Sequence, residues 1–126
     1  MKSTIILLTM VTTIFSACGD SKKDAQADPG SVAEAIFDAA KTGNYKGLSA
    51  LIDTDADNDS KMIGQVETDT NLQEGFKKHF AKGKIAADPT INGDKASVNI
   101  LFGPDGTTEE TFEMVLKNGK WYLVSF

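Results

Sequence analysis

The residues that most restrict the fold are Lys117-Asn118-Gly119-Lys120, which separate two apolar runs. Asn-Gly is the preferred pair of a two-residue hairpin turn because both residues tolerate positive φ. The flanking segments are therefore predicted to form two antiparallel strands in a fixed register. The predicted cross-strand pairs are Leu116 with Trp121, Met114 with Leu123 and Phe112 with Ser125 on one face, and Val115 with Tyr122 and Thr111 with Phe126 on the other. The first face is the more apolar and is expected to pack on helices.

A second strand pattern precedes this hairpin. An alternating pattern, as in a half-buried strand, puts Ala96, Val98, Ile100 and Phe102 on one face and Ser97, Asn99 and Leu101 on the other. Turn-forming clusters at 92–94 and 103–106 separate this strand from its neighbours. From Lys84 onward the chain is therefore predicted to form an antiparallel sheet of about four strands.

The residues before Lys84 carry helical patterns. Ser31 and Glu34 match a capping box that begins a first helix, and Gly43 ends it. A short second helix is expected after Asn44, and a third from Leu72 to Lys82. The segment Met62–Glu67 fits either a short strand or a helical turn. Helices followed by an antiparallel sheet indicate an α+β fold, in which the N-terminal helices pack on the sheet.

The N-terminus has the pattern of an export signal. Met1–Ala17 combines a positive start, a short apolar run and small residues. Phe15-Ser16-Ala17-Cys18 resembles the bacterial lipobox, which implies cleavage before Cys18 and lipidation, palmitate included, of its thiol. We therefore expect a signal peptide over 1–17, a flexible tether over 18–30 and one domain over 31–126. The alternative, an uncleaved membrane helix, requires a longer apolar run.

These features predict a membrane-anchored lipoprotein of the bacterial cell envelope, which faces the periplasm or the cell surface. The formal net charge is −5 and arginine is absent, which argues against nucleic-acid binding. The acyl chains on Cys18 are then the expected membrane contact. Because Cys18 is the only cysteine, no disulfide can form within the chain.

Two segments resemble a known superfamily. Ala35-Ile36-Phe37-Asp38-Ala39-Ala40-Lys41-Thr42-Gly43-Asn44-Tyr45 and Leu116-Lys117-Asn118-Gly119-Lys120-Trp121-Tyr122-Leu123 are similar to small bacterial lipoproteins with a nuclear-transport-factor-2-like (NTF2-like) domain. These domains are also described as cystatin-like, or as SnoaL- or lumazine-binding-like, and many have no assigned function. The resemblance implies a curved sheet wrapped around a helix, which gives a cone-like domain.

The resemblance also supplies candidate pocket residues. Enzymatic members place an acid or base inside the cone, with a hydrogen-bond donor nearby. The corresponding candidates here are Tyr45, His79, Glu113 and Tyr122. Hairpin register puts Glu113 on the same face as Val115 and Tyr122, which favours an ordinary surface role. The family's catalytic aspartate has no matching position in this chain, so no catalytic residue is assigned.

The acidic segment Asp53–Asp59 resembles a calcium-binding loop only in part. Its aspartates alternate, but Asn58 stands where the loop needs glycine and Gly64 where it needs a bidentate glutamate. A solvated acidic loop is the better interpretation. His79 is the only histidine, and one histidine cannot build a zinc site. We therefore predict no metal and no cofactor.

The leading functional hypothesis is a non-catalytic envelope lipoprotein whose domain binds a small ligand or a protein partner. The alternative is a small enzyme of the isomerase or dehydratase kind, with a carboxylate or tyrosine in the cone. A homodimer is a further possibility, because Met114, Val115 and Phe126 form part of an exposed apolar patch if the second face of the sheet is uncovered.

Overall fold

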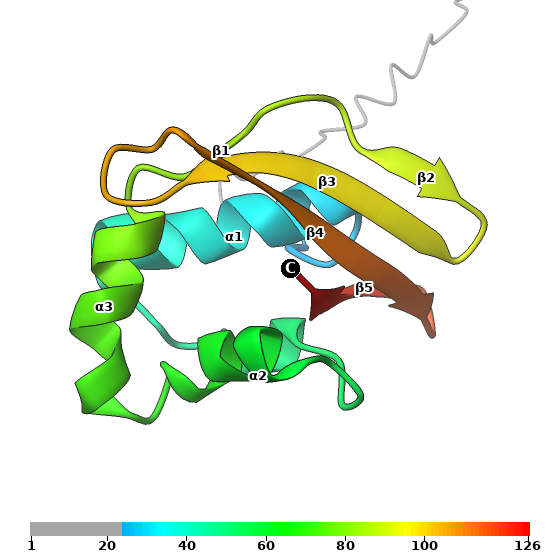
Figure 1. Cartoon of the computed structure of the whole chain (residues 1–126). Coiled ribbons are helices and arrows are strands. Elements are labelled where there is room, and N and C mark those ends of the chain that lie inside the picture. Colours follow the sequence, from blue (N-terminus) through cyan, green and yellow to red (C-terminus); the bar gives the residue numbers. More distant parts are fainter. Residues whose placement is uncertain (1–23) are drawn as a thin grey trace, which may run out of the picture.

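The computed structural model describes residues 24–126. The predicted signal peptide over 1–17 and the predicted lipidation of Cys18 lie outside this range. No helix among the described residues has the length and apolar character needed to cross a membrane. Figure 1 shows three helices packed on one side of a curved antiparallel sheet, so the α+β prediction is confirmed.

The first helix, α1 (Pro29–Thr42), begins two residues earlier than predicted. Asp28 is its N-cap: one carboxylate oxygen accepts from the backbone N–H of Ser31 at 2.8 Å, and the other accepts from the Ser31 hydroxyl at 3.0 Å. Pro29 occupies the first helical turn, where its missing N–H costs nothing. Ser31 therefore lies inside the helix and does not cap it. Gly43 ends the helix with φ +73°, as predicted.

The folded domain also begins earlier than residue 31. The Gln26 side chain is buried, and its amide donates to the carbonyl oxygens of Ala50 at 3.0 Å and Trp121 at 3.1 Å. These contacts tie the segment before α1 to two distant parts of the chain. A flexible tether over 18–30 was expected from composition alone, but residues 24–30 belong to the domain. The low apolar content misled because Gln26 is held by hydrogen bonds and not by apolar burial.

Three further helical segments follow α1, and α3 packs against it at one end (Figure 1). The predicted second helix is the single 3₁₀ turn η1 (Ser49–Leu51), and the ambiguous segment 62–67 belongs mostly to α2 (Asn58–Gln65). The third helix, α3 (Thr70–Phe80), is capped by Asp69 and begins two residues before the predicted start. The earlier start of α3 follows from Asp69, whose carboxylate accepts from the backbone N–H of Asn71 at 2.9 Å.

The sheet contains five antiparallel strands, one more than the approximate prediction. They are β1 (Lys84–Ile85), β2 (Thr90–Asn92), β3 (Lys95–Phe102), β4 (Thr108–Lys117) and β5 (Lys120–Ser125). The main order is β1-β3-β4-β5, and β2 pairs with the other half of β3 on the same edge as β1. The Asn118-Gly119 turn has positive φ at both residues, as its sequence requires.

The predicted hairpin register is correct near the turn and wrong at the far end. Leu116 pairs with Trp121, Val115 with Tyr122 and Met114 with Leu123. Beyond Met114 the register shifts, so that Glu113, and not Phe112, pairs with Ser125. Val124 is the extra residue of this β-bulge on β5. Because one inserted residue exchanges the two faces of a strand, the bulge turns Phe126 toward the helices.

The exposed patch proposed for Met114, Val115 and Phe126 is therefore not formed. Met114 is 2% exposed and belongs to the core. The Phe126 ring packs edge-on against the ring of Phe112, with centroids 5.4 Å apart. The sequence-based argument for a homodimer depended on this patch, and the structure therefore does not support that argument.

One continuous core joins α1, α3 and the inner face of the sheet. The rings of Phe37, Phe80 and Phe112 meet at its centre, with Phe37 6.5 Å from Phe80 and 6.0 Å from Phe112. Gly83 lies so close to the Phe37 ring that a Cβ there would overlap it. The largest side chains with almost no exposure are Ile36, Phe37, Leu48, Ile100, Phe112 and Leu123.

The outer edge of β5 is covered by other parts of the chain. Its Trp121 backbone exchanges hydrogen bonds with Gln26, whose carbonyl oxygen accepts from the Trp121 N–H at 3.1 Å. The Asp53 N–H donates to the Leu123 carbonyl at 2.9 Å, and the Asp57 N–H to the Val124 carbonyl at 2.8 Å. These contacts occupy an edge that would otherwise offer a template for a foreign strand. They also fix where α2 begins.

Candidate functional site

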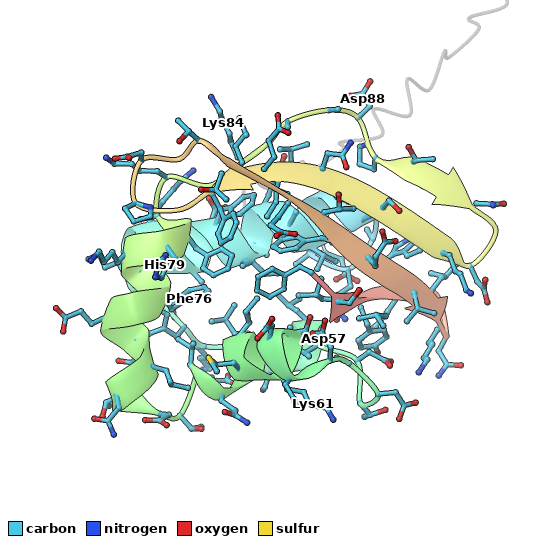
Figure 2. All side chains as sticks on the ribbon, in the orientation of Figure 1. Asp57, Lys61, Phe76, His79, Lys84 and Asp88 are labelled. Atoms are coloured by element: carbon cyan, nitrogen blue, oxygen red, sulfur yellow. The ribbon has the colours of Figure 1, made fainter. Side chains whose placement is uncertain are left out.

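A groove of about 460 Å³ lies between α2, α3 and the end of the sheet. Its volume falls within the range of pockets that hold small molecules. Figure 2 shows Phe76 and His79 on α3, Lys61 on α2 and Asp57 just before α2; these two helices form the walls of the groove. Most lining residues are apolar: Met62, Ile63, Val66, Leu72, Gly75, Phe76, Phe80, Phe102 and Phe126, together with the polar Asp59, Asn71 and His79.

The aromatic part of the groove follows from helical spacing. Leu72, Phe76 and Phe80 are four residues apart and lie on one stripe of α3. The rings of Phe76 and Phe80 stack with centroids 5.0 Å apart, and Phe102 lies 5.2 Å from Phe80. Phe126 completes this surface, 5.9 Å from Phe80. The core thus continues as a row of rings to the groove, where it meets solvent.

Gly75 is the least expected residue of the α3 wall. Glycine in a helix interior costs about 1 kcal/mol relative to alanine. A close neighbour explains the glycine of α2, because a Cβ at Gly64 would lie 3.2 Å from Cγ1 of Ile52. No such reason exists for Gly75, since a Cβ there would have nothing within 4 Å. Gly75 leaves open space on the wall of the groove, and the fold itself does not need that space.

The structure does not bring the four predicted pocket residues together. Only His79 lines the groove, with an exposed side chain. Tyr45 is half-buried and packs edge-on against Phe76, with centroids 5.9 Å apart. Glu113 is exposed and accepts a 2.7 Å hydrogen bond from the hydroxyl of its strand neighbour Ser97. Tyr122 is half-buried and paired with Val115 on the same outer face of the sheet.

The groove itself was not predicted. The apolar stripe of α3 was identified from its spacing, but as buried core. Its partner α2 was an ambiguous segment, and Phe126 was placed on the opposite face of the sheet. The one available signal was Gly75, an isolated glycine inside a helical pattern.

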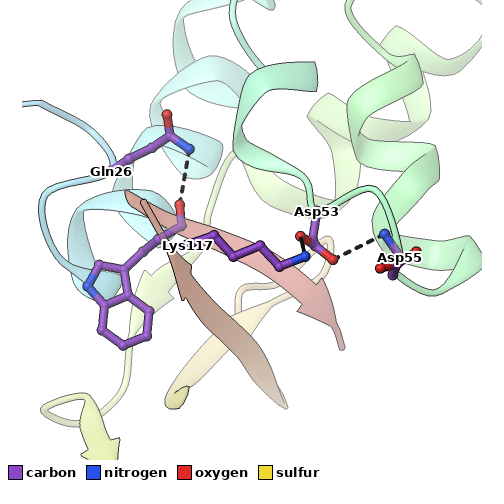
Figure 3. A network of polar contacts seen from close by, with 5 residues as sticks. Gln26, Asp53, Asp55 and Lys117 are labelled. Carbon is purple, nitrogen blue, oxygen red and sulfur yellow. Dashed lines mark hydrogen bonds and ion pairs between the residues drawn. The ribbon is translucent and has the colours of Figure 1, made fainter. Parts of the chain in front are cut away.

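The acidic segment before α2 has structural roles that the sequence did not indicate. Asp53 was expected in a solvated loop, yet its side chain is 6% exposed and bonds the Lys117 ammonium at 2.7 Å (Figure 3). It also accepts from the backbone N–H of Asp55 at 3.1 Å. Asp57 caps α2 by accepting from the N–H of Ser60 at 2.8 Å. Within residues 24–126 no three acidic, histidine or cysteine side chains gather closely enough to hold a metal ion.

Two carboxylates have pKa values below their usual range. The pKa of Asp53 is lowered first by the hydrogen bond from Lys117, an effect that outweighs the opposing cost of burial. The pKa of Glu67 is lowered first by the hydrogen bond from the Ser49 hydroxyl and then by the backbone N–H of Gly47. The pKa of Lys117 is raised, mainly by its bond to Asp53. All three groups hold loops in place, and none lines the groove.

A second cavity, of about 410 Å³, lies between α1 and β1. Phe37, Gly83 and Ile85 form its apolar part. Four of its lining residues are charged, with both signs represented: Glu34, Asp38, Lys41 and Lys84. It lacks the continuous apolar lining of the groove, which is therefore the better candidate site.

Comparisons with known proteins give a similar solved structure but no family. No family model and no curated protein matches this chain. Among solved structures, the chain is similar to a proposed NTF2-like transpeptidase from Campylobacter jejuni. The identity is 20%, the TM-score is 0.49, and the match covers 79% of this chain and 98% of the other. At this identity and TM-score the likeness carries no argument about what this protein binds or catalyses.

Proposed function

We propose that this protein is a non-catalytic lipoprotein of the bacterial cell envelope, whose domain binds a small apolar ligand in the groove between α2 and α3. The groove supports this proposal because it combines an aromatic surface with a few polar groups at its rim. Catalysis is not part of the proposal, since Glu113 and Tyr122 lie on the other face of the sheet and Tyr45 does not line the groove.

Gly75 is the observation that carries the proposal. A glycine that weakens its own helix, at a position where an added Cβ would meet nothing within 4 Å, is unexplained by packing. It is explained if a bound molecule occupies the space above its Cα. Binding sites are also where local rules of sequence and structure are most often broken.

The test compares two substitutions at the same position. Gly75→Leu extends a branched side chain into the groove, whereas Gly75→Ala adds one methyl group and serves as the matched control. Each full-length protein is made in its native host with Cys18→Ser, and its intact mass is measured under non-denaturing conditions. We expect an additional mass in the parent and in Gly75→Ala, lost on denaturation and absent from Gly75→Leu. An additional mass that persists in Gly75→Leu would place the ligand elsewhere.

The envelope part of the proposal has a separate test. If Cys18 carries the lipid, the natural protein sediments with membranes and Cys18→Ser releases it into the soluble fraction. Residues 24–126 contribute no helix that could retain it. Retention of Cys18→Ser with the membranes would contradict the lipid anchor and leave the groove proposal unaffected.

A further inference from the structure

The charge of the molecule is unevenly distributed around the groove. The whole chain carries a formal charge of −5, yet residues 75–87 contain four lysines and one histidine and no acidic residue. Three of these lysines lie at the end of α3 or just after it: Lys77, Lys78 and Lys82. All three are exposed. None of these three lysines forms an ion pair with a carboxylate of residues 24–126. Within that range the ion pair is the one between Lys117 and Asp53.

Helical geometry places part of this basic group at the mouth of the groove. Asn71 and Gly75 line the groove, and Lys78 continues their stripe one turn further along α3. His79 follows at once and lines the groove itself. Lys82 comes directly after the helix, beside Gly106 of the loop that packs on this end.

The opposite wall contributes a carboxylate to the groove lining, whereas the exposed Lys61 of α2 is not among the lining residues. Asp59 is the charged residue that α2 contributes to the groove lining. Acidic residues near the basic end are fewer than the lysines: Glu74 precedes Lys78 by one turn, and Asp105 lies in the 103–106 loop. Lys84 is excluded from the group because it shares the second cavity with Glu34 and Asp38. An anionic group in the groove is therefore attracted to the end of α3 and repelled from the Asp59 carboxylate on the opposite wall.

We propose that the ligand is a single-chain anionic amphiphile of the fatty-acid kind. Its alkyl chain lies over the rings of Phe76, Phe102 and Phe126, and its carboxylate lies at the end of α3 beside His79 and Lys78. The charge difference between the two walls fixes this orientation. The inference rests on the proposed function, because it names the class of ligand for the same groove.

The test uses three probes with the same chain length and different heads: dodecanoate, dodecanol and dodecyltrimethylammonium. Their binding to the full-length Cys18→Ser protein is measured by titration calorimetry below the critical micelle concentration of each probe. We expect dodecanoate to bind most tightly, and its affinity to fall as salt is raised. Gly75→Leu is expected to abolish binding of every probe that enters the groove.

Charge reversal at the end of α3 tests the orientation. Lys78→Glu and Lys82→Glu are each expected to weaken dodecanoate binding about threefold to tenfold, as for a partly exposed charge pair, and to leave dodecanol unchanged. Lys95→Glu, at the start of β3, makes the same change in net charge on another element and is expected to have no effect. Cations in the last turn also stabilise the helix by interacting with its dipole. The melting temperature of each variant is therefore measured as well.

The outcomes separate this inference from the proposed function. Equal binding of dodecanoate and dodecanol, both blocked by Gly75→Leu, would overturn the anionic class and keep the groove. Binding of phosphatidylglycerol vesicles without binding of monomeric dodecanoate would overturn the inference in favour of a membrane surface. If no probe binds and the native protein carries no additional mass, both are overturned.

Discussion

The ammonium of Lys117 lies 2.7 Å from Oδ1 of Asp53, and this contact joins the hairpin turn to the loop that leads into α2. The Asp53 carboxylate is almost fully buried, whereas the Lys117 side chain is 44% exposed. The Asp53 carboxylate also accepts a hydrogen bond from the backbone N–H of Asp55, and the Asp53 N–H donates to the carbonyl of Leu123. One aspartate thus fixes the position of α2, and with it one wall of the groove.

The first prediction concerns this pair. Asp53→Asn and Lys117→Met should each lower the melting temperature, with the larger loss for Asp53→Asn because Asp53 holds more of the surrounding loop. Since the two groups interact directly, the double variant should lose less than the sum of the two single losses. Strictly additive losses in chemical denaturation would contradict a direct contribution of the pair.

The second prediction concerns acid pH. A carboxylate whose folded pKa is lowered contributes stability above its unfolded pKa, and that contribution is lost as the pH falls through the folded pKa. The lowered pKa values of Asp53 and Glu67 therefore predict that the free energy of unfolding falls below about pH 4. Asp53→Asn should flatten this fall between pH 5 and pH 2. An unchanged pH profile for Asp53→Asn, beside an exposed control such as Asp105→Asn, would count against the assignment.

The third prediction contrasts two glycines. Gly75→Ala should stabilise the domain by about 0.5 to 1 kcal/mol, because the methyl group meets nothing and helix propensity improves. Gly83→Ala should destabilise it by about 1 to 3 kcal/mol, because the methyl group overlaps the Phe37 ring. Urea unfolding measures both. A destabilising Gly75→Ala would mean that the space beside Gly75 is filled by the protein itself.

The fourth prediction concerns the bulge on β5. Phe126 touches the rings of Phe80, Phe102 and Phe112 from a half-buried position. Phe126→Ala should therefore cost less than Phe112→Ala, for which about 3 to 5 kcal/mol is expected at a fully buried site. If Phe126 lay on the outer face, as the unbulged register requires, Phe126→Ala would leave stability nearly unchanged.

The fifth prediction concerns the start of the domain. Removal of all residues before Ser31 deletes the Asp28 cap and the Gln26 bonds to Ala50 and Trp121. We expect a loss of about 2 to 4 kcal/mol, from one cap and the three hydrogen bonds that join Gln26 to Ala50 and Trp121. Truncation before Asp24 is the matched control and should be close to neutral. Equal stability of the two truncated proteins in urea unfolding would contradict a domain that begins before residue 31.

Local rules of the sequence account for much of the fold. The Asn118-Gly119 turn determines the hairpin and its first pairs because its backbone conformation admits few residues. The alternation from Ala96 to Phe102 identifies the inner face of β3, and the four-residue spacing of Leu72, Phe76 and Phe80 identifies the buried stripe of α3. Each of these signals depends on residues close together in the chain, so the tertiary structure had nothing to add to them.

Other predictions failed because a distant partner decides them. From the sequence, Gln26 was predicted to be part of a polar tether. In the structure its side-chain amide donates a hydrogen bond to the carbonyl of Trp121, far along the chain. Asp53 was predicted to be a solvated loop residue, but in the structure it forms an ion pair with Lys117. The side on which Phe126 lies depends on one inserted residue, Val124, at which α2 also docks through Asp57.

By itself the sequence determined α1, α3, the hairpin and the apolar faces of these elements, because these follow from short-range geometry. The tertiary structure decided the bulge, the Asp53–Lys117 ion pair and the groove, because each requires groups from distant segments of the chain to meet. The open space beside Gly75 illustrates the difference. The sequence contains the glycine, but the closeness of α2, α3 and Phe126 makes the absence of its side chain part of a site.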